Sequence, residues 1–177
     1  MNLERSLSTD GWMEECELIY LASAAKRSLV IAELGSWKGR STLALAENTD
    51  GVVFCVDVWE DNPLRPMYTG VRGSIFREFQ ENNHEITNVI PLVTTTDLAA
   101  AAMKEIGAKF DLVFIDACHD FDSVERDILS WRPLLRDEGI LCGHDFIGDY
   151  PGVAQAVKLH VPRYRLINSI WTTEPIN

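Results

Sequence analysis

A glycine loop follows an apolar run near residue 30, and its residues are the first in this sequence that could do chemistry. The stretch VIAELGSWKGRST, residues 30–42, passes from branched apolar residues to an acid, Glu33, then to two glycines and the hydroxyl pair Ser41 and Thr42. A glycine loop after a strand often binds a nucleotide, because glycine lets the backbone approach the ligand closely. The residues around the glycines therefore indicate which nucleotide is bound.

The glycine spacing fits neither of the two best-known phosphate loops. A P-loop requires G-x-x-x-x-G-K-[ST], but Gly35 and Gly39 are one residue too close and Arg40 stands where the lysine should be. The dinucleotide fingerprint G-x-G-x-x-G is also missing, and Trp37 would crowd a pyrophosphate against the backbone. An NAD-dependent enzyme is therefore the weakest of the alternatives.

Two acids near the loop point instead to a cationic ligand without phosphate. Glu33 stands just before the loop, where a carboxylate repels phosphate and suits an ammonium or sulfonium group. Asp57 closes the next apolar run, where an acid can hold both ribose hydroxyls. Close backbone approach, an acid for a cation and an acid for ribose together describe S-adenosylmethionine. The competing interpretation is a tight strand–helix turn with incidental acids.

A second group of polar residues ends two later apolar runs. FIDACHDF contains Asp116 and His119, and GHDF contains His144 and Asp145. Neighbouring strand ends in a parallel sheet lie roughly 5 Å apart, so these side chains should converge. Oxygen and nitrogen ligands at one spot suit a divalent ion. Histidine is a poor ligand for Mg²⁺ and a better one for Mn²⁺, Fe²⁺ or Zn²⁺, so both the presence and the identity of a metal stay open.

The same group could move a proton. Histidine is the common general base of enzymes, so His119 could remove a hydroxyl proton, with Asp116 as organiser and His144 as a metal ligand or second base. The structural alternative is that Asp116 caps the next turn and His119 bonds a backbone carbonyl. We expect Asp122 to be the N-cap of the following helix, with Glu125 at the capping-box position.

Strand-like apolar runs alternate with helical segments along the chain. The runs SLVIAEL, GVVFCVDV, NVIPLV, KFDLVFID and EGILCGHDF are continuously apolar, which is typical of strands covered on both faces. The alternation predicts an α/β, Rossmann-like, doubly wound and mostly parallel sheet with helices on both faces. Ligands of such sheets bind beyond the carboxyl ends of the strands, where the acids and histidines stand. One domain should span residues 1–177, with a helical segment over 1–28 and the core over 29–177.

Composition narrows the partners and the location. The formal net charge of −11 argues against a nucleic-acid partner. The N-terminus has no signal-peptide pattern and no apolar run reaches membrane-spanning length, so we expect no membrane partner. The four cysteines form no C-x-x-C pair, and two lie in apolar runs, which favours reduced thiols and a cytoplasmic protein.

Over about residues 11–158 the sequence resembles the small class I S-adenosylmethionine-dependent methyltransferases. The resemblance is carried by GWMEECELIYLA, VIAELGSWKGRSTLALA, VDVW, FDLVFIDACHDFDSVERDILSWRPLLRDEGILCGHDF and PGVAQAV. Within that class the chain is similar to the group of macrocin-type sugar O-methyltransferases and cephalosporin hydroxylase-like proteins. The resemblance implies a seven-stranded sheet with a last antiparallel strand near the C-terminus, and YRLINSIWTTEP would supply the final hairpin.

The resemblance also implies roles for individual residues. Relatives with catechol-type or macrocin-type chemistry place a metal-binding acid at the Asp116 position and further acids or an amide at the positions of His144 and Asp145. The catechol-type pattern D-x-x-K places a lysine base where this chain has His119. The implied cofactor contacts are Gly35, Ser36, Trp37 and Gly39 for the methionine part, Ser41 for its carboxylate, Asp57 for ribose, Val58, Trp59, Thr96 and Asp97 for adenine, and Glu33, Thr42 and Asp116 beside them.

The sequence therefore predicts methyl transfer from S-adenosylmethionine to the hydroxyl of a small-molecule or sugar-like acceptor, with metal assistance by Mg²⁺ or Mn²⁺ left open. The alternatives are a hydroxylase-like protein and a non-catalytic S-adenosylmethionine-binding protein of the same fold. The chain is short for this family, so a homodimer could complete the site. The segment 60–79 carries several arginines and could form a lid over an anionic acceptor; the alternative is an ordinary connection.

Overall fold

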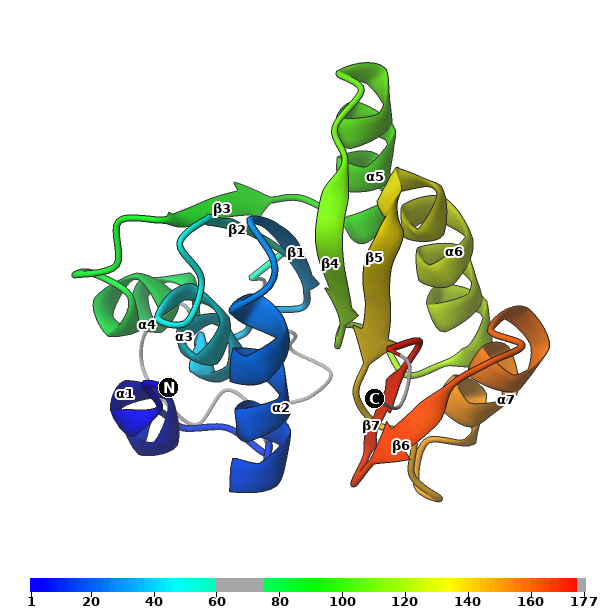
Figure 1. Cartoon of the computed structure of the whole chain (residues 1–177), viewed down its shortest axis with the longest axis horizontal. Helices are drawn as coiled ribbons and strands as arrows, with labels where there is room; N and C mark the ends of the chain where they lie inside the picture. The colour runs from blue at the N-terminus through cyan, green and yellow to red at the C-terminus, as the bar shows by residue number, and fades with distance from the viewer. Residues whose placement is uncertain (60–74, 175–177) are drawn as a thin grey trace.

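The chain folds into one mixed sheet with helices packed on both of its faces (Figure 1). The structure, a computed structural model, describes residues 1–59 and 75–174. In chain order the elements are α1 (Glu4–Ser8), α2 (Glu15–Ala25), β1 (Val30–Leu34), α3 (Arg40–Ala46), β2 (Val52–Asp57), α4 (Ile75–Asn82), β3 (Val89–Val93), α5 (Thr96–Glu105), β4 (Phe110–Ile115), α6 (Phe121–Trp131), the 3₁₀ turn η2 (Arg132–Leu134), β5 (Leu135–Gly143), α7 (Pro151–His160), β6 (Arg165–Ile167) and β7 (Ile170–Thr172).

The sheet has seven strands in the order β3-β2-β1-β4-β5-β7-β6. Strands β1 to β5 pair in parallel, and β7 pairs antiparallel with both β5 and β6. This confirms the predicted doubly wound fold, including the late antiparallel strand and the final hairpin. The order reverses between β1 and β4, so the carboxyl ends of β1 and β4 flank the place where such sheets bind ligands.

Successive residues of the central strands pack into opposite helical layers. On β1, Ile31 belongs to the core shared with α2, α3 and α4, whereas Ala32 belongs to the core shared with α5, α6 and α7. On β4, Phe114 and Val113 divide in the same way. Because both faces of these strands are buried, most of their residues are apolar; the exceptions are Glu33 near the end of β1 and Asp111 near the start of β4.

Two large apolar residues of the helices lie at the surface. Ile19 of α2 is 41% exposed, and Leu129 of α6 is 53% exposed. Each follows a buried residue by one position, Leu18 and Ile128 respectively. One residue turns an α-helix by about 100°, which is enough to carry a side chain past the edge of the buried face.

The N-cap of α6 is Asp120, so the prediction of Asp122 is wrong by two residues. The Asp120 side chain accepts a hydrogen bond from the Ser123 backbone N–H at 3.0 Å, and its own backbone is extended. Asp122 already lies in the first helical turn. An acid there still complements the positive end of the helix dipole, which is why both positions look suitable in the sequence.

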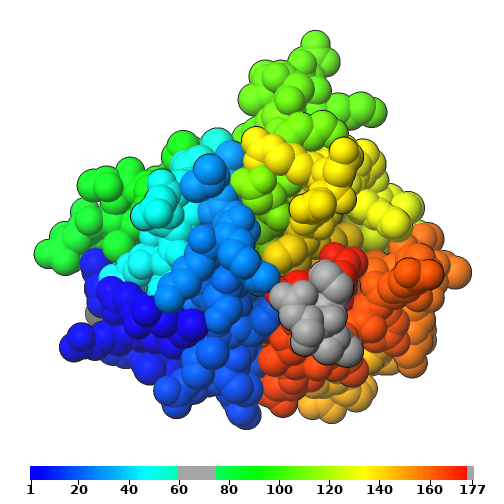
Figure 2. Space-filling view, viewed as in Figure 1, coloured from blue at the N-terminus to red at the C-terminus, as the bar shows by residue number. Residues whose placement is uncertain are grey.

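The space-filling view shows α5 projecting from the body, and the β6–β7 hairpin, in orange and red, beside the blue N-terminal helices (Figure 2). All four cysteines lie in the described part and are free thiols, with Cys55 and Cys142 buried as expected. Within residues 1–59 and 75–174, no helix is long and apolar enough to cross a membrane.

The predicted lid falls mainly outside the described residues. Of the segment 60–79, residues 60–74 are not described, and the remainder begins α4. There Ile75 and Phe79 are buried, as the interpretation of an ordinary connecting helix requires. The lid itself stays a prediction.

Asp127 is a buried acid on α6, and its ionisation should affect the stability of the protein. Its carboxylate is almost fully buried and accepts a hydrogen bond from the Thr96 hydroxyl at 2.5 Å, at the start of α5. Burial raises the pKa of Asp127 to about 6, in spite of the Thr96 hydroxyl. The protonated form is thus favoured by folding, so stability should fall as the pH rises from about 4 to about 6.

We therefore expect Asp127→Asn to be more stable than the wild type at pH 8, by on the order of 2 kcal/mol, and equally stable at pH 4. The asparagine oxygen can still accept the Thr96 hydroxyl and carries no charge to bury. Urea unfolding at both pH values measures the difference. Asp122→Asn, at an exposed position on the same helix, should show no such pH-dependent gain. If the difference in stability between Asp127→Asn and the wild type does not change with pH, ionisation of the buried Asp127 is not its cause.

Candidate active site

The glycine loop, residues 35–39, lies where three parallel strands end. The Gly35 N–H donates to the Val56 carbonyl at 2.8 Å, and the Asp116 N–H donates to the Leu34 carbonyl at 2.7 Å. Gly35 and Gly39 both have left-handed backbones, with φ of 84° and 91°. The loop is therefore tied to the ends of β1, β2 and β4, at the ligand-binding edge of the sheet.

Glu33, at the end of β1, holds the loop through side chains. Its carboxylate is fully buried and accepts hydrogen bonds from the hydroxyls of Ser36 at 2.6 Å, Ser41 at 2.5 Å and Thr42 at 2.5 Å. Burial raises the pKa of Glu33, although the three hydroxyl donors favour its ionised form. The carboxylate thus fixes the loop and the start of α3.

The expected direct contacts of Glu33, Ser41 and Thr42 with the cofactor stay predictions. In the described structure their side chains bond to one another, so their established contribution is to hold the shape of the loop. The sequence contained a signal for this network, because three hydroxyl residues follow a single acid at an apolar strand end. The family resemblance assigns those hydroxyls to a ligand instead.

Asp57, at the end of β2, holds the same loop through its backbone. Its Oδ2 accepts the N–H groups of Ser36 and Trp37, each at 2.9 Å, and its Oδ1 accepts the Trp59 N–H at 2.7 Å. A carboxylate oxygen can accept two hydrogen bonds, so Oδ1 keeps one position for a ribose hydroxyl. Binding of ribose by Asp57 stays a prediction that this geometry permits.

The four residues expected near adenine divide into two pairs. Val58 and Asp97 are exposed, beside the ends of β2 and β3. Trp59 is buried against Phe79, with its Nε1 donating to the Trp37 carbonyl at 2.8 Å. Thr96 donates its hydroxyl to Asp127, so its side chain serves the packing of α5 on α6. The exposed pair is better placed to meet a ligand.

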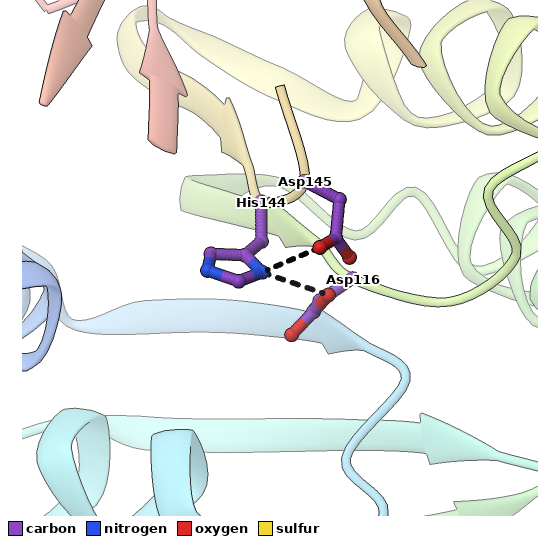
Figure 3. Close-up of side chains that lie close together, drawn as sticks. All are labelled: Asp116, His144 and Asp145. Atoms are coloured by element: carbon purple, nitrogen blue, oxygen red, sulfur yellow. Dashed lines mark ion pairs between the residues drawn. The ribbon is translucent and has the colours of Figure 1, made fainter. Parts of the chain in front are cut away.

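The predicted acid and histidine group converges beside the loop (Figure 3). Asp116 follows β4, while His144 and Asp145 follow β5. His144 Nδ1 lies 3.2 Å from Asp145 Oδ1 and 3.7 Å from Asp116 Oδ1. One ligand atom from each of the three residues lies within 4.8 Å of the others, which is a spacing that one metal ion can bridge.

His119 joins this group through Asp145. His119 Nε2 lies 2.8 Å from Asp145 Oδ2, and the imidazole ring packs on Tyr150 with ring centroids 4.2 Å apart. Asp145 therefore contacts both histidines, one with each oxygen. Its backbone is left-handed, with φ of 62°, a conformation that is uncommon outside glycine and is often found at functional sites.

A small cavity of about 10 Å³ is lined by the four polar residues of this group, Asp116, His119, His144 and Asp145, together with apolar neighbours. That volume has room for about one water-sized occupant. The cavity lies between the carboxylates and the imidazoles, so its occupant would be held by several polar atoms at once.

The charges of the group depend on one another. Burial opposes a charge on His144, but hydrogen bonds to Asp145 and Glu17 outweigh it and raise its pKa to about 10. Burial also opposes ionisation of Asp145, yet the two histidines hold its pKa well below the ordinary value. Burial raises the pKa of Asp116 well above the ordinary value. A bound cation would stabilise the ionised form of Asp116, so the donor set fits a metal ion.

Glu17 of α2 completes the group, and it is a site residue that the motifs in the sequence do not single out. Its side chain is only 1% exposed, and its Oε2 lies 3.2 Å from His144 Nε2. Burial opposes its ionisation, but His144 and Ser169 lower its pKa to about 2. An acid on the apolar face of a helix was a weak signal, because Glu17 also suits the capping box at the start of α2.

Residues 32–146 match the sequence profile of a family described as a methyltransferase domain. A search of curated proteins found no match. The matched range includes the glycine loop and the acid and histidine group, but it excludes Glu17 and the final hairpin.

Three solved structures illustrate the structural likeness. An O-methyltransferase from Bacillus cereus in complex with SAH has a TM-score of 0.69 at 17% identity, with 96% of this chain and 89% of that chain covered. A methyltransferase from Podospora anserina, PaMTH1, bound to SAH, has a TM-score of 0.65 at 16% identity, with coverage of 96% and 84%. CalS11, a TDP-rhamnose 3′-O-methyltransferase of calicheamicin biosynthesis, has a TM-score of 0.65 at 14% identity, with coverage of 88% and 76%.

Proposed function

This chain belongs to the methyltransferase-domain family, and we propose that it transfers the methyl group of S-adenosylmethionine to a hydroxyl oxygen of a small molecule. The observation that carries the proposal is the glycine loop at the carboxyl end of β1. Glu33 holds the Ser36 hydroxyl and Asp57 holds the loop backbone, so that the loop lies beside Asp116, and no phosphate-binding pattern is present in it. That arrangement suits an adenosyl cofactor with a cationic sulfonium.

The neighbours support the choice of cofactor and acceptor. Two of them were solved with SAH, the product that S-adenosylmethionine leaves after methyl transfer. Two are O-methyltransferases, and one of these acts on TDP-rhamnose, a sugar nucleotide. We therefore favour a hydroxylated, sugar-like acceptor.

The residues of the chain have two tasks in this reaction. S-adenosylmethionine supplies an activated methyl group, so the protein has to place the acceptor in line with it and remove the hydroxyl proton. His119 is the proposed base. Asp145 holds its Nε2, and a carboxylate on one ring nitrogen fixes the tautomer and leaves the other nitrogen to accept a proton.

Asp116, His144 and Asp145 are the proposed metal ligands. One imidazole nitrogen and two carboxylates suit Mn²⁺ better than Mg²⁺, which prefers oxygen alone. A divalent ion held there would polarise the acceptor oxygen and ease loss of its proton. Asp116 would organise this end of the site, because its backbone also contacts the glycine loop.

We also infer a cytoplasmic location and a homodimer. The free thiols of all four cysteines support the location. The dimer is proposed because a second copy could close the acceptor side of the site. Light scattering on the purified protein measures the oligomeric state.

The proposal is tested by calorimetry with SAH. We expect saturable binding in the micromolar range, and no comparable heat with NAD or ATP, because the loop lacks both phosphate-binding patterns. Absence of binding at millimolar SAH would reject the proposal. Transfer of a labelled methyl group to a panel of hydroxylated compounds, with and without a chelator, then identifies the acceptor class and any metal dependence.

A further inference from the structure

We propose that Glu17 is a positioning residue that fixes the His144 imidazole with Nδ1 toward Asp116 and Asp145, and that it thereby selects Mn²⁺-like or Co²⁺-like ions over Mg²⁺. The inference rests on the metal site proposed above. It assigns a role in that site to α2, which is distant in sequence from all three ligands.

The carboxylate of Glu17 is held from three directions. Its Oε1 accepts hydrogen bonds from the Asn168 Nδ2 at 3.0 Å, from the Ser169 N–H at 3.1 Å and from the Ser169 hydroxyl. Its Oε2 accepts the Glu14 N–H at 2.8 Å and lies 3.2 Å from His144 Nε2. With these donors fixed, the carboxylate cannot turn away from the imidazole.

Glu17 determines which nitrogen of His144 carries a proton. An ionised carboxylate only accepts hydrogen bonds, so the Nε2 that faces it must carry a hydrogen. Ser169 fits the same assignment, because its single hydroxyl hydrogen is donated to Glu17 and its oxygen, 3.1 Å from Nε2, is left to accept. The lone pair of a neutral His144 is then on Nδ1.

That lone pair faces two carboxylates. Nδ1 lies 3.2 Å from Asp145 Oδ1 and 3.7 Å from Asp116 Oδ1 (Figure 3). Three acceptors that face one another repel unless a positive charge lies between them. A proton on Nδ1 can supply that charge, and so can a metal ion that takes its place. Carboxylate, histidine and metal in this order form a recurrent arrangement in which the carboxylate orients the imidazole.

The positions of the elements support a role beyond helix capping. Glu17 does complete the capping box of α2, but that task needs only its bond to Glu14. The Oε1 contacts go to the turn between β6 and β7, where Asn168 has a left-handed backbone with φ of 53°. Helix α2 and the β6–β7 hairpin lie side by side (Figure 2), and each places a polar side chain, Glu17 and Ser169 respectively, beside His144 Nε2.

The test is a titration of the metal-free protein with Co²⁺, followed by the visible absorption bands of the bound ion. We compare the wild type with Glu17→Gln and with Glu15→Gln, which removes a charge from an exposed position in the same helical turn. Loss of such an orienting partner typically weakens metal binding by about 10- to 100-fold, which is our expectation for Glu17→Gln. Glu15→Gln should bind Co²⁺ as the wild type does, and the wild type should prefer Mn²⁺ to Mg²⁺.

Two results would overturn the proposal. One is unchanged Co²⁺ affinity in Glu17→Gln, which would reduce Glu17 to a capping residue. The other is a wild type that binds no Co²⁺ at millimolar concentration, which would leave His144 paired only with carboxylates. If Glu17→Gln does not fold, the Co²⁺ titration is made with Ser169→Ala, because this variant removes a contact to both Glu17 and His144. An unchanged Co²⁺ affinity of Ser169→Ala would also reject the proposal. SAH calorimetry in the absence of metal reports separately on the proposed methyl transfer.

Discussion

Replacing Gly35 with alanine is expected to weaken SAH binding by about 10- to 100-fold, because the binding geometry of the loop can be restored only against an overlap that costs about 1–3 kcal/mol. A Cβ at residue 35 would lie 2.1 Å from the Asp116 carbonyl oxygen and 2.8 Å from the Ala117 Cα. Both are backbone atoms at the end of β4, so no side-chain rotation relieves the overlap. The loop must move away from Asp116, and the cofactor site moves with it.

The same substitution should lower the free energy of unfolding by on the order of 3 kcal/mol. About 1 kcal/mol comes from the left-handed backbone at φ 84°, and the overlap adds about 1–3 kcal/mol. The matched control is Gly107→Ala. Gly107 is also left-handed, with φ 69°, but no atom lies within 4 Å of the added Cβ. Gly107→Ala should therefore lose only the stability that the left-handed backbone costs, about 1 kcal/mol, and should bind SAH as the wild type does.

Calorimetry with SAH and urea unfolding separate the two effects. If Gly35→Ala and Gly107→Ala are destabilised equally and both bind SAH as the wild type does, the close approach of the loop to Asp116 is not needed for cofactor binding. The proposed cofactor site would then have to be placed elsewhere on the sheet.

The sequence allowed the fold to be predicted because the relevant signal is local. The central strands β1, β2 and β4 are mostly apolar, and that pattern follows directly from their burial between the two helical layers. The convergence of Asp116, His144 and Asp145 could be predicted for a similar reason. Residues that follow parallel neighbouring strands meet at one edge of the sheet, whatever their separation in the chain.

The side-chain contacts of Glu33 and Glu17 could not be predicted, because each carboxylate has more than one possible hydrogen-bond partner and the amino-acid sequence does not distinguish between them. The Glu33 carboxylate could face either a ligand or nearby hydroxyls, and in the structure it bonds to Ser36, Ser41 and Thr42. Glu17 could be a capping residue or a partner for a distant histidine, and the structure shows both contacts. Both cases require knowledge of which side chains lie within hydrogen-bonding distance, and only the packing of the whole chain decides that.

A further expectation concerns His119, which should be needed for catalysis and not for cofactor binding. Its Nε2 lies 2.8 Å from Asp145 Oδ2, and its side chain is one-quarter exposed at the edge of the small cavity. Removal of a positioned general base typically lowers turnover by about 10²- to 10⁴-fold. We expect a loss of this size in kcat for His119→Ala, measured with whichever hydroxylated acceptor the wild type methylates, and an SAH affinity close to that of the wild type.

The comparison of His119→Ala with two other variants distinguishes a base from a structural residue. His84→Ala removes an exposed histidine whose ring lies beside Glu85, and it should leave turnover unchanged. Asp145→Asn keeps the shape of the partner of His119 but weakens its hold on the imidazole, so it should lower kcat as well.

If His119→Ala retains full turnover while Asp145→Asn loses it, Asp145 acts through the metal site alone. The acceptor proton would then have to leave through His144 or water, and the role of His119 would be limited to its packing on Tyr150.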